Sequence, residues 1–360
     1  MKGFEGGHQV ADRVLHPYLG YCPREIADRL SRARRRTREA PDGTCSVLVV
    51  GGSVAAKFFK FGLPVLSELE PLAGYDVLRI SGADGGYKQP QQVMLLAYYL
   101  SVGAVPDLVI NLDGFNEVAL AAVNLTHGVH PVQPSVPHWM PIARSALGSA
   151  EVVEAFAQVA GLRSELAEGL DRARASPFLS SVLVADPVLR RLEGLLGRYR
   201  QSSLRLAAQM SRDSDVEHFL GPPTEGPEDL QPAIENWLNG SRSLAGLCSA
   251  HGIAYVHVLQ PTLHVAGAKP MSDQERRQCT IGPRYRFGVE VGYPLLREAG
   301  ATLREEGIAF LDATDVFADV EETLYYDNCH FGAEGNRILA EAIAEFLSSA
   351  LHGGALELSD

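Results

Sequence analysis

The sequence lacks a long apolar segment and an excess of basic residues. No run reaches the roughly 18 consecutive apolar residues that suggest a membrane-spanning helix, and residues 1–25 contain no uninterrupted apolar core of the signal-peptide kind. We therefore expect no membrane span and a cytoplasmic protein. Acidic residues outnumber basic ones by 44 to 32, and the net charge of −12 argues against a nucleic acid or an anionic membrane as a partner.

Cysteine is also scarce. The chain has five cysteines, an odd number, and none forms a Cys-x-x-Cys pair. We expect reduced thiols rather than a disulfide framework or a zinc site. His127, His130 and His138 fall in a proline-rich stretch without a carboxylate or cysteine at ligand spacing, so we interpret them as solvated loop residues. No metal and no organic cofactor is predicted.

The chain contains five short apolar runs, each followed by a helical pattern. The runs fall at residues 47–50, 75–80, 107–112, 253–259 and 308–311. Repeated strand-then-helix units imply right-handed crossovers and a parallel sheet between two helix layers. The sequence therefore predicts an α/β protein, a three-layer α/β/α sandwich with a five-stranded parallel sheet.

The connection between the third and fourth runs, from about residue 118 to 252, is far longer than an ordinary crossover. Its parts are predicted as a loop at 124–141, amphipathic helices at 151–173 and 187–210, a polar segment at 211–227 and a crossover helix at 230–248. We expect a large helical insertion at about 119–228, which is either a cap over a site or a decorative subdomain. The whole chain then divides into a lead-in and helix at 1–43 and a main domain at 44–360.

Two segments of the chain are rich in basic residues. The run Arg32-Ala-Arg-Arg-Arg36 in the helix-like stretch 25–40 is expected to be the solvated face of a helix. Residues 269–286, which contain four arginines, are interpreted either as a positively charged lid or as a solvated loop.

The stretch Cys45–Phe59 joins a buried strand to a helix through Gly51-Gly52, and Ser53 follows at the start of the helix. Ligands bind at the carboxyl ends of strands in an open α/β sheet. The helix's first N–H groups and its positive dipole end favour an anion formed at the serine. Taken alone, the same pattern also fits a tight turn with Ser53 as the N-cap.

Three further blocks follow in order along the chain: Asp84-Gly-Gly86, Gly114-Phe-Asn116-Glu117 and Asp327-Asn-Cys-His330. Together with Gly51-Gly-Ser53, this set resembles the SGNH (GDSL-like) hydrolase family over about residues 45–118 and 250–350. The resemblance implies a flavodoxin-like sandwich of the SGNH hydrolase type. The insertion is not explained by it.

The resemblance implies a Ser-His-Asp triad. Ser53 takes the nucleophile position, although Gly52 stands where the family carries an aspartate. His330 is the matching general base, because an imidazole can take the serine proton and return it to the leaving group. Asp327 lies three residues earlier, so in a helical turn its carboxylate can orient the imidazole. The alternative for this pair is a capping aspartate and a surface histidine.

The resemblance also implies an oxyanion hole. Its donors are the backbone N–H of Ser53, the backbone N–H of Gly86 and the side-chain amide of Asn116. Gly85 is the alternative to Gly86, since the Asp-Gly-Gly loop permits a one-residue shift. Glu117 replaces the usual aspartate of its block and is interpreted as support for the site.

The leading hypothesis is a serine esterase or deacylase that hydrolyses a small-molecule acyl ester through an acyl-enzyme on Ser53. An acyltransferase would use the same first half-reaction, so the sequence leaves it open. A non-catalytic small-molecule binding module is the alternative from another class, although neither the G-x-G-x-x-G nor the P-loop pattern occurs at the first turn. The acyl group, the acceptor and the oligomeric state are not predicted.

Overall fold

The computed structural model describes residues 13–147, 150–178, 181–212, 226, 228–354, 356 and 358. The chain divides into two compact units, one formed by Met1–Ile142 with Gly221–Asp360 and the other by Ala143–Leu220. The second unit is shorter than the predicted insertion at 119–228, because residues 119–142 and 221–228 belong to the first.

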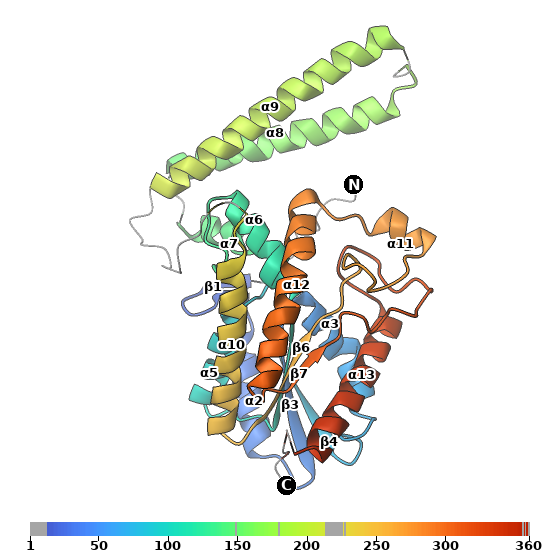
Figure 1. Cartoon of the computed structure of the whole chain (residues 1–360). Helices are drawn as coiled ribbons and strands as arrows, with labels where there is room; N and C mark the ends of the chain where they lie inside the picture. Colours follow the sequence, from blue (N-terminus) through green and yellow to red (C-terminus); the bar gives the residue numbers. More distant parts are fainter. Residues whose placement is uncertain are drawn as a thin grey trace. The chain divides into compact units, whose positions relative to one another are not determined.

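A five-stranded parallel sheet forms the centre of the first unit (Figure 1). Its strands are β3 (Thr44–Gly51), β4 (Asp76–Ala83), β5 (Leu108–Asp113), β6 (Ala254–Leu259) and β7 (Phe310–Asp312). Their order across the sheet is β4-β3-β5-β6-β7, the flavodoxin-like arrangement in which the first strand of the sheet lies second. The predicted fold class is confirmed.

Helices cover both faces of the sheet (Figure 1). One layer consists of α3 (Ser53–Phe61), α4 (Leu63–Leu66) and α13 (Ala333–His352), and the other of α2 (Ile26–Arg38), α5 (Gln91–Ser101), α10 (Gln231–Ala250) and α12 (Pro283–Glu305). Residues 47–50 of β3 are fully buried, with Val47 and Val49 in the first apolar cluster and Leu48 and Val50 in the second. A strand with apolar side chains on both faces has to lie between two helix layers, which fixes β3 inside the sheet.

The predicted irregular lead-in contains regular structure. Residues 13–16 and 20–23 form an antiparallel hairpin, β1 (Arg13–His16) and β2 (Gly20–Pro23). Tyr21 and Cys22 are fully buried in the same cluster as Leu95 of α5. The hairpin therefore belongs to the core of the first unit. The first 12 residues of the predicted 1–43 segment lie outside the described residues.

The second unit is a helical hairpin of α8 (Ala150–Ala175) and α9 (Val182–Arg212). The two helices pack along each other, with Gly169 of α8 against Leu192 of α9. Leu162 and Leu195 are buried, whereas Leu189 and Leu204 are exposed. Both helices were predicted, with ends displaced by a few residues. The predicted polar segment 211–227 lies almost entirely outside the described residues.

Two segments contain more structure than was predicted. The expected loop at 124–141 includes the end of α6 (Ala121–Thr126) and the start of α7 (Val136–Leu147), with Pro141 inside the helix. The segment 269–286 includes α11 (Asp273–Gln278) and the start of α12, and its Lys269 and Glu275 are buried. A fully solvated loop at 269–286 is therefore ruled out.

Within the described residues, no helix is both long enough and apolar enough to cross a bilayer.

Candidate active site

The turn after β3 requires glycine. Gly51 has φ = 136°, in the region that side chains rarely adopt, and a Cβ there would lie 2.1 Å from the carbonyl oxygen of Leu112. Gly52 then caps α3, so Ser53 is the first helical residue. Its backbone N–H points out of the helix end, where no intrahelical acceptor exists. Ser53 thus lies at the carboxyl end of β3 and the amino end of α3.

Ser53, His330 and Asp327 form a continuous series of hydrogen bonds. His330 Nε2 is 2.7 Å from Ser53 Oγ, and His330 Nδ1 is 2.8 Å from Asp327 Oδ2. Because a carboxylate only accepts hydrogen bonds, the ring proton belongs on Nδ1, which leaves Nε2 to accept from the serine hydroxyl. The structure thereby brings together a hydroxyl and an imidazole that are 277 positions apart in the sequence.

Asp327 is held by its own loop. Its Oδ1 accepts the backbone N–H groups of Cys329 at 2.9 Å and His330 at 2.8 Å, which fixes the carboxylate beside the imidazole. Burial raises the pKa of Asp327, but the hydrogen bond and charge interaction with His330, together with the two backbone N–H groups, outweigh it, so the pKa lies below its ordinary value. Asp327 is therefore ionised at neutral pH.

Cys329 lies beside His330, with its Sγ 3.5 Å from Nδ1. Burial, reinforced by the negative charge of Asp327, raises the pKa of this thiol well above its ordinary value. A thiol in this state is protonated and a poor nucleophile. Of the two potential nucleophiles that contact His330, Ser53 Oγ lies 2.7 Å from Nε2, whereas Cys329 Sγ lies 3.9 Å from it.

Asn116 lies against the nucleophile turn. It opens the π-helical turn η1 (Asn116–Leu120) after β5, and π-helical turns are frequent at functional sites. A Cβ on Gly52 would lie 2.1 Å from Asn116 Nδ2. The amide occupies the space that a side chain at position 52 would need, so this position favours glycine. The same amide donates to the carbonyl oxygen of Tyr87 at 2.8 Å.

The loop after β4 distinguishes Gly86 from Gly85. The N–H of Gly85 donates to Asp84 Oδ1 at 2.9 Å, and its carbonyl accepts the Tyr21 hydroxyl at 2.9 Å. For the N–H of Gly86, no acceptor occurs among the residues that the structure describes. Gly86 also has φ = 79°, which favours glycine. Of the two alternatives, Gly86 is the one with a donor available to a ligand.

His138 was interpreted as a solvated loop residue, and that interpretation is wrong. Its ring lies against Gly86, where an added Cβ would be 2.5 Å from the ring, and it stacks on Tyr21 with ring centroids 6.2 Å apart. Burial, together with the nearby positive charge of Arg13, lowers the pKa of His138 to about 4. The three histidines of this proline-rich stretch showed no ligand spacing, and no motif indicated that His138 lies near Gly86. A neutral imidazole therefore lies against the Gly86 loop.

Glu117 links the two loops that carry Gly86 and Asn116. Its Oε2 accepts the N–H of Gly114 at 2.8 Å, and its Oε1 accepts the N–H of Gln89 at 3.2 Å and the Gln92 side chain at 3.1 Å. Burial, followed by the charge of Asp113, raises the pKa of Glu117 above its ordinary value. The position interpreted as support for the site is a buried bridge between two loops.

Asp113 and His257 form a buried pair near Glu117. Asp113 Oδ1 accepts from Trp237 Nε1 at 2.6 Å and lies 2.8 Å from His257 Nε2. All three side chains are buried. The other ring nitrogen, His257 Nδ1, forms a hydrogen bond with the hydroxyl of Ser241, which is also buried. Such a pair fixes the end of β5 against β6 and α10.

Asp327, Cys329 and His330 are also the one group of three potential metal ligands found within the described ranges. Their ligand atoms lie within 4.8 Å of one another. A metal there would need the Cys329 thiolate, which burial disfavours, and would compete with the hydrogen bonds that join His330 to Asp327 and Ser53. The donor set fits a hydrogen-bonded triad better than a metal centre.

Comparison with known proteins adds little. No family model matches the chain, and no curated protein matches it. Among solved structures, it is similar to the crystal structure of a "putative acylhydrolase" from Bacteroides fragilis. The two share 10% sequence identity, with a TM-score of 0.40 over 89% of this chain and 97% of the other. A likeness this distant says nothing about activity, which has to be inferred from the site.

Proposed function

We propose that the protein is a serine-dependent esterase or deacylase that forms an acyl-enzyme on Ser53. The observation that supports this most directly is the series Ser53 Oγ, His330 and Asp327, with successive separations of 2.7 and 2.8 Å. These distances are those expected of a nucleophile, its general base and the group that orients the base.

In the proposed first half-reaction, Ser53 Oγ attacks the acyl carbonyl carbon while His330 Nε2 takes the hydroxyl proton. The resulting tetrahedral oxyanion collapses, the ester C–O bond breaks, and His330 returns the proton to the leaving alcohol. Asp327 stays ionised and stabilises the imidazolium. Water, activated by the same His330, then attacks the acyl-enzyme, releases the carboxylic acid and restores the Ser53 hydroxyl.

The oxyanion is proposed to bind the N–H groups of Ser53 and Gly86 and the Asn116 amide. Support comes from the helix start at Ser53, from the available N–H of Gly86, and from Asn116 Nδ2 beside Gly52. One preorganised donor of this kind typically contributes about 10²–10³ in kcat. Transfer to a second acceptor would need the same groups, so an acyltransferase remains within the proposal.

Hydrolysis of p-nitrophenyl esters of short and long acyl chains tests the proposal. We expect Ser53→Ala and His330→Ala each to lose roughly a thousandfold or more in kcat, as members of a coupled triad do. Ser101→Ala, a surface serine of α5, is the matched control and should retain full activity. Unchanged turnover in Ser53→Ala would remove the nucleophile assignment. No turnover in the unmodified protein would favour the binding module.

A further inference from the structure

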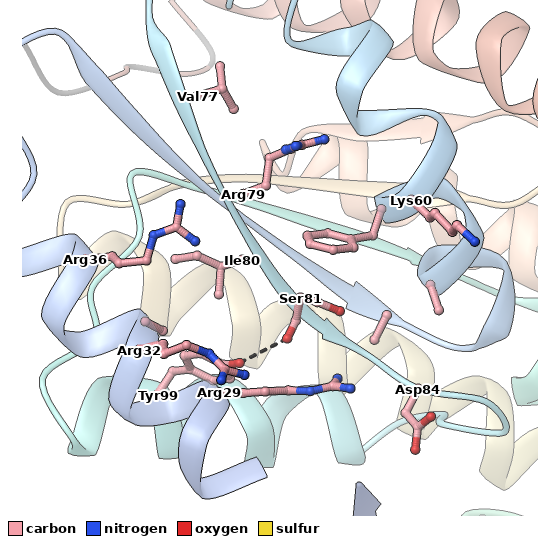
Figure 2. A pocket seen from close by; sticks show the side chains of 14 residues that line it. Arg29, Arg32, Arg36, Lys60, Val77, Arg79, Ile80, Ser81, Asp84 and Tyr99 are labelled. Atoms are coloured by element: carbon pink, nitrogen blue, oxygen red, sulfur yellow. Dashed lines mark hydrogen bonds between the residues drawn. The ribbon is translucent and has the colours of Figure 1, made fainter. Parts of the chain in front are cut away.

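A cavity of about 810 Å³ lies along the outer edge of β4, between α2 and α3 (Figure 2). Five cationic side chains line it, and we call it the β4 groove after the strand at its centre. They are Arg29, Arg32 and Arg36 of α2, Lys60 of α3 and Arg79 of β4. This concentration of positive charge occurs on a chain whose net charge is −12.

The three arginines of α2 share one face of the helix, since they are three and four residues apart. Figure 2 shows them around the outer side of β4, together with Arg79 from the strand itself and Lys60 from the next helix. Like charges at this spacing repel each other within a helix. The groove therefore combines positive charge from three elements, and the repulsion among the arginines lowers the stability of α2.

Most of these cations have no acidic partner. Arg29 binds Glu25 at 2.7 Å, but Arg32, Arg36, Arg79 and Lys60 form no salt bridge with any residue in the part of the chain that the structure describes. The acidic residue of the lining, Asp84, is bound by Arg13 at 2.8 Å. The positive charge of the groove is not neutralised from within the described molecule.

Two ordinary explanations account for only part of this cluster. Basic residues in the last turn of α2, such as Arg36, interact favourably with the helix dipole. A charged residue on an edge strand, such as Arg79, blocks pairing with another sheet. Neither explains why cations from the first turn of α2, from α3 and from β4 line the same cavity.

The shape and the floor of the groove indicate the kind of anion. A volume of about 810 Å³ is in the range of small-molecule sites. The apolar floor of the groove is formed by Phe59 and Val77 on the α3 side of β4, whereas Ile80 is buried on the opposite face of the sheet. The Tyr99 hydroxyl donates to the Ser81 carbonyl at 3.0 Å (Figure 2). Arginine forks bind phosphate oxygens in pairs. The combination suits phosphate groups joined to an apolar or planar portion.

We propose that the β4 groove binds a phosphorylated small molecule of the nucleotide class, with its phosphates on the arginines and its planar portion on the apolar floor. The proposal does not depend on the chemistry proposed for Ser53. The groove does reach Asp84, two residues before Gly86, so a bound ligand would lie beside the loop that carries one proposed oxyanion donor.

Calorimetric titration of the full chain with ATP and with inorganic tripolyphosphate tests the proposal. We expect ATP to bind more tightly than tripolyphosphate, because only ATP can use the apolar floor, and both to weaken with added salt. Replacing Arg32, Arg36 and Arg79 together by glutamine should weaken ATP binding about tenfold or more. Arg35→Gln, an exposed arginine of α2 outside the groove, should change it less than twofold.

Three outcomes would overturn the proposal. They are absence of ATP binding at millimolar concentration, equal weakening by Arg35→Gln, and binding of a poly-glutamate peptide in place of ATP. Vesicles containing a phosphoinositide form a further arm, and binding to them without binding to ATP would also overturn it. Circular dichroism of the triple variant checks its fold. The same titration with Ser53→Ala should be unchanged, so failure of the esterase proposal and failure of this one are distinguishable.

Discussion

At the scale of single residues, Gly52 leaves room for the Asn116 amide. A side chain there would collide with the Asn116 amide, whose Nδ2 lies 2.1 Å from the position of an added Cβ. We expect Gly52→Asp to displace Asn116 and lower kcat/KM about a hundredfold, the loss typical of one oxyanion donor. Ester hydrolysis measures this. Gly74→Ala, where an added Cβ meets nothing within 4 Å, is the control. Full activity in Gly52→Asp would contradict the donor role of Asn116.

Glu117 offers a second test at this scale. Both of its oxygens accept N–H donors, so in Glu117→Gln the amide nitrogen would face a donor and one loop would lose its bond. We expect kcat to fall roughly tenfold to a hundredfold with little change in KM, because the substrate contacts remain and only the donor geometry is disturbed. Steady-state kinetics beside the surface variant Glu68→Gln measure the split. Unchanged kcat in Glu117→Gln would contradict this role of Glu117.

The protonation state of Asp327 predicts the pH profile. Since the pKa of Asp327 lies below its ordinary value of 3.8, this carboxylate stays ionised during mild acidification. We therefore expect no loss of kcat/KM from protonation of Asp327 during mild acidification, so log(kcat/KM) should fall with a slope no steeper than one. A limb of slope two would show that Asp327 titrates in the same range, and would contradict this account.

At the scale of elements, the loop that carries Asp327 is anchored by α11. Glu275 is buried, pairs with Lys269 at 2.9 Å, and accepts the backbone N–H groups of Leu324 at 2.9 Å and Tyr325 at 3.0 Å. Burial raises the pKa of Glu275, but the bond from the Tyr325 N–H and the other hydrogen bonds lower it below its ordinary value. This element holds the chain two residues before Asp327.

Lys269→Met is expected to destabilise the protein by about 3–5 kcal/mol, because it leaves a buried carboxylate without its cation. Urea denaturation measures the change in the free energy of unfolding. Arg277→Met, an exposed cation of α11, should change it by less than about 0.5 kcal/mol. Equal stability of the two variants would mean that the buried ion pair does not anchor the loop.

The sequence predicted elements where local pattern and tertiary role agree. Buried strands such as β3 and β5 were found because their side chains are apolar on both faces. The hairpin β1–β2 was missed, since its short turn-rich segments become regular only by pairing and by burying Tyr21. Helix α7 was missed around Pro141 because a proline inside a helix opposes the local preference that the interpretation relied on.

The same contrast applies to the candidate site. Ser53, Asp327, His330, Gly86 and Asn116 were named from four motifs, and their catalytic roles stay predictions. The hydrogen bond from the Gly85 N–H to Asp84, which favours Gly86 as the donor, depends on loop geometry that no motif encodes. His138 came close to Gly86 through α7, an element the sequence did not reveal.

At the scale of the whole molecule, positive charge gathers in the β4 groove, and a long insertion forms a unit of its own. An acidic protein has a basic groove at the edge of its sheet, and its long third crossover contains a separate helical unit, Ala143–Leu220. That this unit caps the site stays a prediction. The four motif loops belong to the other unit, so the proposed triad and oxyanion donors all lie outside the helical hairpin.

The central claim is that Ser53 is an activated nucleophile. Reaction with a fluorophosphonate, followed by mass spectrometry of the intact protein and its peptides, tests it most directly. We predict one adduct, on the peptide containing Ser53, that is absent in Ser53→Ala and strongly slowed in His330→Ala. No adduct, or an adduct that persists in Ser53→Ala, would contradict the claim.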